Sequence, residues 1–391
     1  MLKVSKKISR LRTETAFDVL KRAEMLSQEG RGIINLGIGQ PNFETPKHIV
    51  EAAVAALYDG HHGYTSAPDI SILRELVAED LFEFTGVSVK PERIVIVPGG
   101  KGTIFFLILM FGELGVKILY PNPGFSIYQS MIEFTGAKAI PIKLREEDNF
   151  SFTADVVLAQ ITENTRLLIL NSSGNPTGGT IPKNEIDRLV LGLAEKFPWV
   201  AVLSEEIYSR ITYGGQDLVS LLIYPELADR LILLDGWSKR YAMTGWRIGY
   251  GVWPESLVEN AIRLSINCHS CVNTASQYAG ITALNGPQDS VVEMVSQFSK
   301  RRRLIVQGLN DLSGVSCIMP SGAFYAFPNI KETGLRADIF QDLLLESAGV
   351  ATVGGTSFGL MGEGYLRFFY ANSMEHIQIA LDRVSFLLET I

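Results

Sequence analysis

Short apolar runs alternate with helical patterns between about residues 90 and 253, and this alternation constrains the fold more than any other feature of the chain. Several runs are β-branched and apolar on successive residues, which is typical of strands buried on both faces. Such strands predict an α/β fold, with a mostly parallel sheet covered by helices on both sides. The predicted strands are 93–97, 116–120, 139–142, 166–170, 200–203, 231–234 and 247–252.

The rest of the chain has a different pattern. From residue 257 onward long helical patterns dominate, including 290–311 and a closing helix over 376–388, with short strand-like pieces between them. Residues 1–45 show no strand-helix alternation and are expected to pack against this last part. A chain of 391 residues exceeds the usual size of one core. We therefore predict a large α/β domain over 46–285 and a smaller α+β domain made of 1–45 plus 286–391.

Composition excludes several classes of protein. The 35 Lys and Arg residues against 42 Asp and Glu residues give a net charge of −7, which argues against nucleic acids and anionic membranes as partners. The longest apolar stretch, 104–111, is too short to cross a bilayer, and no signal peptide precedes it, so a cytoplasmic location is expected.

The three cysteines cannot form a disulfide framework. Two of them lie in Cys268-His269-Ser270-Cys271, which has redox-motif spacing but no second ligand pair. This absence favours a structural segment over a metal or redox site.

A candidate anion site follows the first predicted strand. The segment Pro98-Gly99-Gly100-Lys101-Gly102 leads directly into a helical run over 103–111, which brings free N–H groups and a positive helix end together. It is not a P-loop, because Val95 stands where that motif needs its first glycine. Taken alone, the segment fits a plain tight turn equally well.

A lysine follows the strand predicted over 231–234. Lys239 lies where burial lowers the pKa of an amine and favours the neutral form that a Schiff base requires. Ser238 precedes it, and Arg247 stands eight positions after it at the head of the next predicted strand. A hydroxyl and a guanidinium at these positions are suited to the anion expected at Gly99 and Gly100.

The segment Ser238-Lys239 followed by Thr244-Gly245-Trp246-Arg247 resembles the pyridoxal-phosphate lysine motif of the class I/II aminotransferases, the aspartate-aminotransferase-like group of fold type I. The resemblance implies a seven-stranded, mostly parallel sheet sandwiched by helices, a smaller α+β domain, and pyridoxal 5′-phosphate as cofactor. It covers nearly the whole chain, because further family markers occur in order at 37–43, 63–66, 98–102, 175–178, 205–208, 321–325 and 364–367.

The resemblance assigns roles around the cofactor. Lys239 is expected to carry it as an internal aldimine and to move the proton between the substrate Cα and the cofactor C4′. Phe125 matches the aromatic residue that stacks on the pyridine ring. The expected phosphate ligands are the N–H groups of Gly99, Gly100 and Lys101 and the side chains of Ser238 and Arg247. For Arg247 an internal salt bridge is the competing interpretation.

Asn175 and Tyr208 match the residues that hydrogen-bond the cofactor O3′. The segment Asn175-Pro176-Thr177-Gly178 alone also fits a simple turn. Arg367 matches the arginine that clamps the substrate α-carboxylate, with Asn175 beside it and a backbone N–H from Gly39. The alternative is that an internal acid neutralises Arg367.

Glu205 departs from the family pattern, which nearly always has aspartate here to pair with the pyridine nitrogen. Neighbouring residues at a strand end point to opposite sides, so only one of Glu205 and Glu206 can face the ring, and the resemblance favours Glu205. Glutamate keeps the charge but adds a methylene group. The cofactor or the strand is therefore expected to shift slightly, and the departure leaves room for chemistry other than transamination.

Tyr64 matches the tyrosine that reaches the cofactor phosphate of a neighbouring subunit. This match predicts a homodimer with shared active sites, whereas a buried aromatic residue in the loop is the alternative. Asp69 stands where the family often has glycine, which leaves the course of this loop open.

The resemblance therefore predicts an enzyme, an aminotransferase that moves an amino group between an amino acid and a 2-oxo acid, with Lys239, Glu205 and Tyr208 as catalytic residues. The alternative is an enzyme of the same fold that acts as a β-lyase, decarboxylase or oxidase. A regulatory protein is disfavoured, because fewer than fifty residues precede the helix start at 45–46 and they contain no basic recognition helix.

A nicotinamide dehydrogenase is excluded by the lack of a glycine fingerprint. The substrate side chain stays open. Lys101 suits an acidic side chain, whereas Phe17, Phe324 and Tyr325 suit an apolar one.

Overall fold

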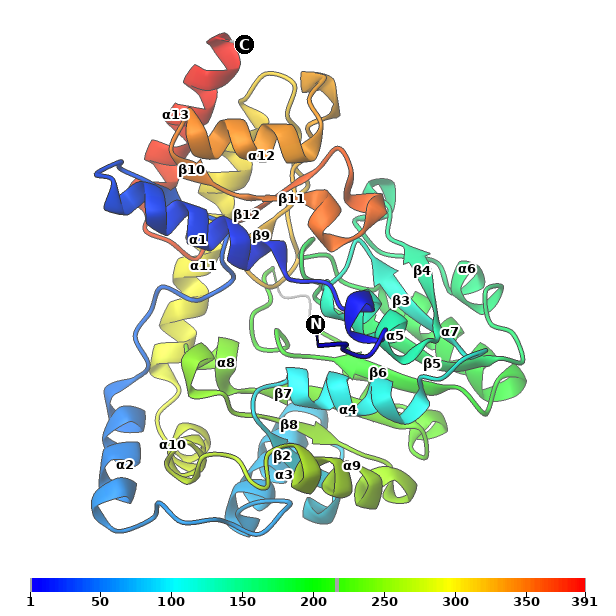
Figure 1. Ribbon diagram of the computed structural model, residues 1–391. Coiled ribbons are helices and arrows are strands. Elements are labelled where there is room, and N and C mark those ends of the chain that lie inside the picture. Colours follow the sequence, from blue (N-terminus) through cyan, green and yellow to red (C-terminus); the bar gives the residue numbers. More distant parts are fainter. Residues whose placement is uncertain (1, 215–217, 391) are drawn as a thin grey trace.

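The computed structural model describes residues 2–214 and 218–390, and its largest part is built around one seven-stranded sheet (Figure 1). The strand order is β2-β8-β7-β6-β5-β3-β4, and only β8 runs antiparallel to its neighbours. This sheet confirms the predicted fold class, and every predicted strand belongs to it. The strands are β2 (Ile94–Val97), β3 (Lys117–Asn122), β4 (Lys138–Lys143), β5 (Thr165–Asn171), β6 (Ala201–Glu205), β7 (Leu231–Gly236) and β8 (Gly249–Val252).

Successive residues of β2 enter different hydrophobic cores, whereas the edge strand β4 is buried only in part. On β2, Val95 and Val97 pack in the core that contains α4 (Lys101–Phe111) and α5 (Ile127–Thr135), whereas Ile94 and Ile96 pack in the core that contains α3 (Ser71–Thr85) and α10 (Thr274–Asn285). Both faces are covered, so the strands need apolar residues at consecutive positions. This burial explains why they read as unbroken apolar runs.

The other helices close to this sheet follow the alternating order of the sequence. They are α2 (Lys47–Tyr58), α6 (Ala154–Leu158), α7 (Lys183–Lys196), α8 (Trp237–Arg240) and α9 (Glu255–Cys268). No helix in the described parts of the chain combines the length and the apolar character that a bilayer span requires. The cytoplasmic location stays a prediction.

The second region holds two small sheets and four helices. Strand β12 (Leu366–Phe369) lies between β11 (Val353–Gly354) and β9 (Tyr325–Ala326) in an antiparallel sheet, and β1 (Ile34–Asn35) pairs in parallel with β10 (Val350–Ala351). The helix α11 extends from the vicinity of α10 into this region (Figure 1). The helices are α1 (Thr15–Gln28), α11 (Asp289–Asn310), α12 (Ala337–Glu346) and α13 (Met374–Thr390).

The N-terminal segment contacts both regions. On α1, Val19 and Ala23 are buried in one cluster with Leu345 of the second region. Before α1, the Arg12 guanidinium pairs with Glu133 on α5 at 3.0 Å. The segment therefore bridges the small region and the edge of the large sheet. The domain boundaries at 45/46 and 285/286 stay predictions.

Asp69 adopts the backbone conformation that glycine favours. Its φ is +81°, and its side chain is 1% exposed. The carboxylate accepts hydrogen bonds from the Thr65 hydroxyl at 2.7 Å, from the Val272 N–H at 3.1 Å and from the Gln277 amide at 2.8 Å. These three bonds offset the strain of a side chain in the left-handed region, and they fix the loop that carries Tyr64.

Candidate active site

The carboxyl ends of the parallel strands carry the polar residues of the site, as expected for an open α/β sheet. Asn171 ends β5 and lies in register with Glu205, the last residue of β6. The Asn171 amide donates to the Glu205 carbonyl at 3.2 Å, and its oxygen accepts from the Asn175 N–H at 3.0 Å. One side chain therefore holds the two strand ends and the 175–178 turn together.

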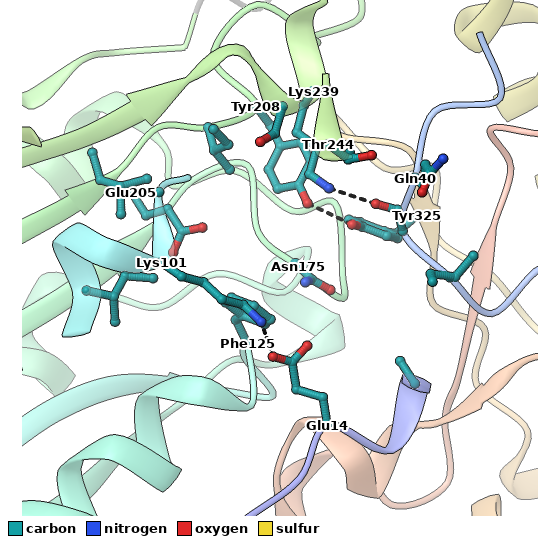
Figure 2. A pocket seen from close by; sticks show the side chains of 18 of the residues that line it. Glu14, Gln40, Lys101, Phe125, Asn175, Glu205, Tyr208, Lys239, Thr244 and Tyr325 are labelled. Carbon is teal, nitrogen blue, oxygen red and sulfur yellow. Dashed lines mark hydrogen bonds and ion pairs between the residues drawn. The ribbon is translucent and has the colours of Figure 1, made fainter. Parts of the chain in front are cut away.

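A cavity of about 450 Å³ opens at this edge of the sheet. Figure 2 shows Lys239, Tyr208 and Tyr325 at one side of it, and Lys101 and Glu14 at the other. Every residue predicted for the site lines this cavity, except Gly99 and Tyr64. The predicted residues that it brings together are Gly39, Gly100, Lys101, Phe125, Asn175, Glu205, Tyr208, Ser238, Lys239, Arg247 and Arg367.

Gly99 lies just behind the cavity and makes room for Arg247. A Cβ at Gly99 would lie 2.2 Å from Arg247 Nη2, and the residue has a φ of +77°. The Gly99 N–H donates to the Val97 carbonyl at 2.7 Å, so it already has an acceptor in this structure, and its role as a phosphate ligand stays a prediction. Gly100 and Lys101 stand at the start of α4, where N–H groups lack intrahelical acceptors.

Arg247 lies before its strand and not at its head. Strand β8 begins at Gly249, two residues later than predicted, because Arg247 has a φ of +53° and ends a 3₁₀ turn. Its guanidinium donates to the Thr244 carbonyl at 2.7 Å and to the Pro98 carbonyl at 3.4 Å. Both partners are neutral, so no salt bridge within the described residues accounts for this arginine.

Arg367 is 3% exposed and comes from β12. It donates to the Asn175 side-chain oxygen at 2.9 Å and to the Gly37 carbonyl at 2.5 Å, while its Nε has no partner in the described structure. The alternative of an internal acid is therefore wrong for the residues described. A buried guanidinium without a counter-charge is costly. Its position suits a ligand carboxylate.

Lys239 lies on α8, directly after β7, and points into the cavity (Figure 2). Its Nζ donates to the Gly39 carbonyl at 2.7 Å. Burial, together with the charges of Arg367 and Arg247, lowers the pKa of Lys239 to about 7. The neutral and nucleophilic amine is therefore well populated near neutral pH.

Glu205 faces the cavity, whereas Glu206 bonds to the Ser204 hydroxyl at 2.7 Å and to the Leu221 N–H at 3.1 Å. This arrangement follows from the alternation of side chains along β6. The Tyr128 hydroxyl donates to the Glu205 carboxylate. Burial raises the pKa of Glu205 to about 7, and the hydrogen bond from Tyr128 opposes this shift.

Two tyrosines of this site were not assigned a polar role from the sequence. Tyr128 is the second residue of α5, and only its spacing of three residues from Phe125 suggests that it lies near the site. Tyr325, expected to line an apolar pocket, hydrogen-bonds the Tyr208 hydroxyl at 2.7 Å. The two rings meet edge to face, with centroids 5.7 Å apart. Tyr325 therefore fixes the position of the Tyr208 hydroxyl.

Comparisons with known proteins agree with this geometry. The profile of the family "Aminotransferase class I and II" matches residues 31–384. An aspartate aminotransferase of Pyrococcus horikoshii is 36% identical over 91% of each chain, and aromatic-amino-acid aminotransferase 2 of Thermococcus litoralis is 35% identical over 93% of this chain and 94% of its own. A crystal structure of the aspartate aminotransferase from Rhizobium meliloti superimposes with a TM-score of 0.94 at 31% identity, over 100% of this chain and 99% of that one.

The lowered pKa of Lys239 predicts how its labelling depends on pH. In cofactor-free protein, acetylation of Lys239 by acetic anhydride should rise through pH 7 and level off above about pH 8, because the neutral amine reacts and is fully formed one unit above its pKa. Peptide mass spectrometry measures the modified fraction, with the exposed Lys47 as the reference site. A labelling rate that still climbs between pH 9 and pH 10 would contradict the shift.

Proposed function

Because this chain belongs to the class I and II aminotransferases, we propose that its cavity binds pyridoxal 5′-phosphate on Lys239 and there moves an amino group between an amino acid and a 2-oxo acid. Family membership confirms the prediction of a pyridoxal-phosphate-dependent aminotransferase. The alternative chemistries of the same fold gain no support from the relatives reported above, whose names are all those of aminotransferases.

The proposal rests on two arginines of the cavity. Among the described residues, both have only neutral hydrogen-bond partners. Arg247 bonds to backbone carbonyls beside the start of α4, and Arg367 bonds to an amide and a carbonyl oxygen. Two separate anions fit these two guanidinium groups, a phosphate and a carboxylate. The phosphate and the substrate α-carboxylate of an aminotransferase are such a pair, and Lys239 lies in the same cavity.

The residues around the cofactor site have distinct tasks in this proposal. When bound, pyridoxal 5′-phosphate supplies an aldehyde that joins amines and a ring that accepts the electrons of a broken Cα–H bond. Lys239 Nζ would hold the cofactor and, once a substrate amine has taken its place, would move the proton at the substrate Cα. Glu205 lines the cavity, and its carboxylate would stabilise a positive charge on the cofactor ring. Phe125 supplies a flat apolar wall.

Arg367 and Tyr208, each oriented by a neighbouring side chain, bind the substrate and polarise the cofactor ring in this proposal. Arg367 holds the substrate α-carboxylate, with Asn175 orienting the guanidinium through the 2.9 Å hydrogen bond. The Tyr208 hydroxyl, held by Tyr325, is placed to donate to the cofactor O3′. Gly39 permits Tyr325 to come close, because a Cβ there would lie 2.5 Å from the tyrosine oxygen.

The assignment of Lys239 is tested by reduction with borohydride. Protein loaded with pyridoxal 5′-phosphate should carry the reduced cofactor on the peptide that contains Lys239, and Lys239→Ala should carry none there. Turnover of Lys239→Ala should fall by at least about 100-fold, the lower end of what a general acid-base group contributes. Cofactor found on another lysine of the folded wild-type protein would overturn the assignment.

The role of Glu205 is tested by removing its charge. Glu205→Gln should still bind the cofactor but lose about 10²–10³-fold in kcat, the usual effect of removing one electrostatic stabiliser. In Tyr128→Phe the pKa of Glu205 should rise, because the hydrogen bond that lowers it is gone. The acidic limb of the pH-activity profile should then move to higher pH.

The matched control for Tyr128→Phe is Tyr224→Phe. The Tyr224 hydroxyl bonds to the surface residue Asp187 at 2.6 Å, away from the cavity, so its loss should leave the profile in place. Turnover of Glu205→Gln equal to that of the wild type would refute the electrostatic role.

We further propose that the enzyme is a homodimer with Tyr64 completing the site of the partner subunit. Tyr64 is 90% exposed, so the alternative of a buried aromatic residue is wrong for the single chain. Six residues before it along the chain, α2 ends in an exposed apolar face with Val54 at 46%, Leu57 at 51% and Tyr58 at 88%. Such a contiguous face is typical of an interface.

The dimer proposal predicts a specific defect in Tyr64→Phe. Sedimentation should show a dimer for the wild type and for this variant, because the aromatic ring is kept. Pyridoxal 5′-phosphate should dissociate about tenfold more readily from Tyr64→Phe, which lacks one hydrogen bond to a charged phosphate. Tyr58→Phe on the same face is the control and should retain the cofactor. A fully active monomer would contradict the proposal.

A further inference from the structure

An ion pair joins two distant parts of the chain inside the cavity. The Lys101 ammonium donates to the Glu14 carboxylate, and both side chains line the cavity. Lys101 is the first residue of α4, and Glu14 directly precedes α1. Figure 2 shows the pair beside Phe125, on the far side of Asn175 from Lys239. The pair and the reacting amine therefore line one cavity, with Asn175 between them in this view.

Only one basic side chain among the described residues of the cavity has no task in binding the cofactor or the substrate α-carboxylate. Among the described residues, the basic side chains that line it are Lys101, Lys239, Arg247 and Arg367. Under the proposed function, Lys239 and Arg247 serve the cofactor and Arg367 serves the α-carboxylate. Lys101 is left, and Glu14 already neutralises it.

Glu14 is held in place from both sides. On one side the Arg12 N–H donates to the Ser130 hydroxyl at 2.9 Å, and the Arg12 guanidinium pairs with Glu133. On the other side Val19 of α1 is buried against the second region. The Glu14 side chain is 22% exposed, less than the 38% of Lys101. The carboxylate is therefore a fixed part of the cavity wall.

The surroundings of the pair are apolar. The Lys101 Nζ lies 5.2 Å from the centroid of the Phe125 ring and 5.9 Å from that of Phe17, and both rings line the cavity. We propose that Glu14 determines specificity by neutralising Lys101, so that the cavity selects amino acids with an uncharged side chain over acidic ones. This inference rests on the proposed function.

Competition between carboxylates explains the selection. An acidic substrate would have to displace Glu14 from Lys101 or lie beside it, and two carboxylates in a confined space repel each other. A leucine or phenylalanine side chain meets no such repulsion and can lie against Phe17 and Phe125. Overall sequence similarity does not show whether acidic or uncharged substrates are preferred, because relatives named for aspartate and for aromatic amino acids match this chain at 36% and 35% identity.

The experiment compares acidic and neutral amino acids in the amine half-reaction of the holoenzyme. The kcat/KM for aspartate and glutamate is divided by that for leucine and phenylalanine in the wild type, Glu14→Gln and Glu14→Ser. The wild type should favour the neutral pair. In both variants the acid-to-neutral ratio should rise by about 10- to 100-fold, the size of one hydrogen bond to a charged group.

Two further variants test whether the freed Lys101 ammonium is what raises the acid-to-neutral ratio. In Glu14→Gln combined with Lys101→Met, the gain for acidic substrates should disappear, because the freed ammonium produces it. Glu346→Gln is the matched control, since Glu346 pairs with Arg22 of α1 at 2.9 Å outside the cavity and its loss should leave the ratio unchanged. Calorimetry adds a readout without turnover, in which succinate should bind about tenfold more tightly to Glu14→Gln than to the wild type.

The outcomes separate the inference from the proposed function. An unchanged ratio in both Glu14 variants, or a wild type that favours acidic amino acids, would overturn the role of Glu14 while leaving an active aminotransferase. Cofactor-loaded wild type that no amino acid converts would instead contradict the proposed function.

Discussion

Positive charge without internal compensation is the constraint on which the site depends. Lys239, Arg247 and Arg367 line one cavity, and the two guanidinium groups are held by carbonyl and amide oxygens in the described structure. Oxygens of this kind orient an arginine without cancelling its charge. The positive field lowers the pKa of Lys239 in addition to the effect of burial. The same charges that are set to bind anions therefore also keep the lysine reactive.

Much of this arrangement could be predicted from the sequence, because it follows from the sheet. Strands buried on both faces produce unbroken apolar runs, and their carboxyl ends meet at one edge. Asn175, Glu205 and Lys239 each follow such a run, so their convergence follows from the order of strands. The start of β8 was predicted two residues too early, because nothing local shows that Arg247 takes a positive φ. The bond from the Gly99 N–H to the Val97 carbonyl could not be predicted for a similar reason, since it depends on turn geometry.

Contacts between distant segments could not be predicted. Glu14 and Lys101 are 87 positions apart, and Tyr128 and Glu205 are 77 apart. No periodicity links such pairs, because their approach depends on the packing of α1 against the second region and of α5 against the large sheet. Asp69 is a third case. Its positive φ is typical of glycine, and its stability comes from Gln277 and Val272, more than two hundred residues away.

The charged groups of the cavity are of two kinds, arginines whose partners are neutral oxygens and carboxylates that accept a hydrogen bond from a side chain of the protein. Glu205 and Glu14 are acids in a site intended for anionic ligands, and each has a donor from the chain itself, Tyr128 in one case and Lys101 in the other. A buried or confined carboxylate without such a donor would take up a proton or bind to the nearest arginine. Tyr128 and Lys101 hydrogen-bond the two acids, and in the described structure neither acid is a partner of the guanidinium groups. The partners of the acids thus preserve the charge that the arginines offer to ligands.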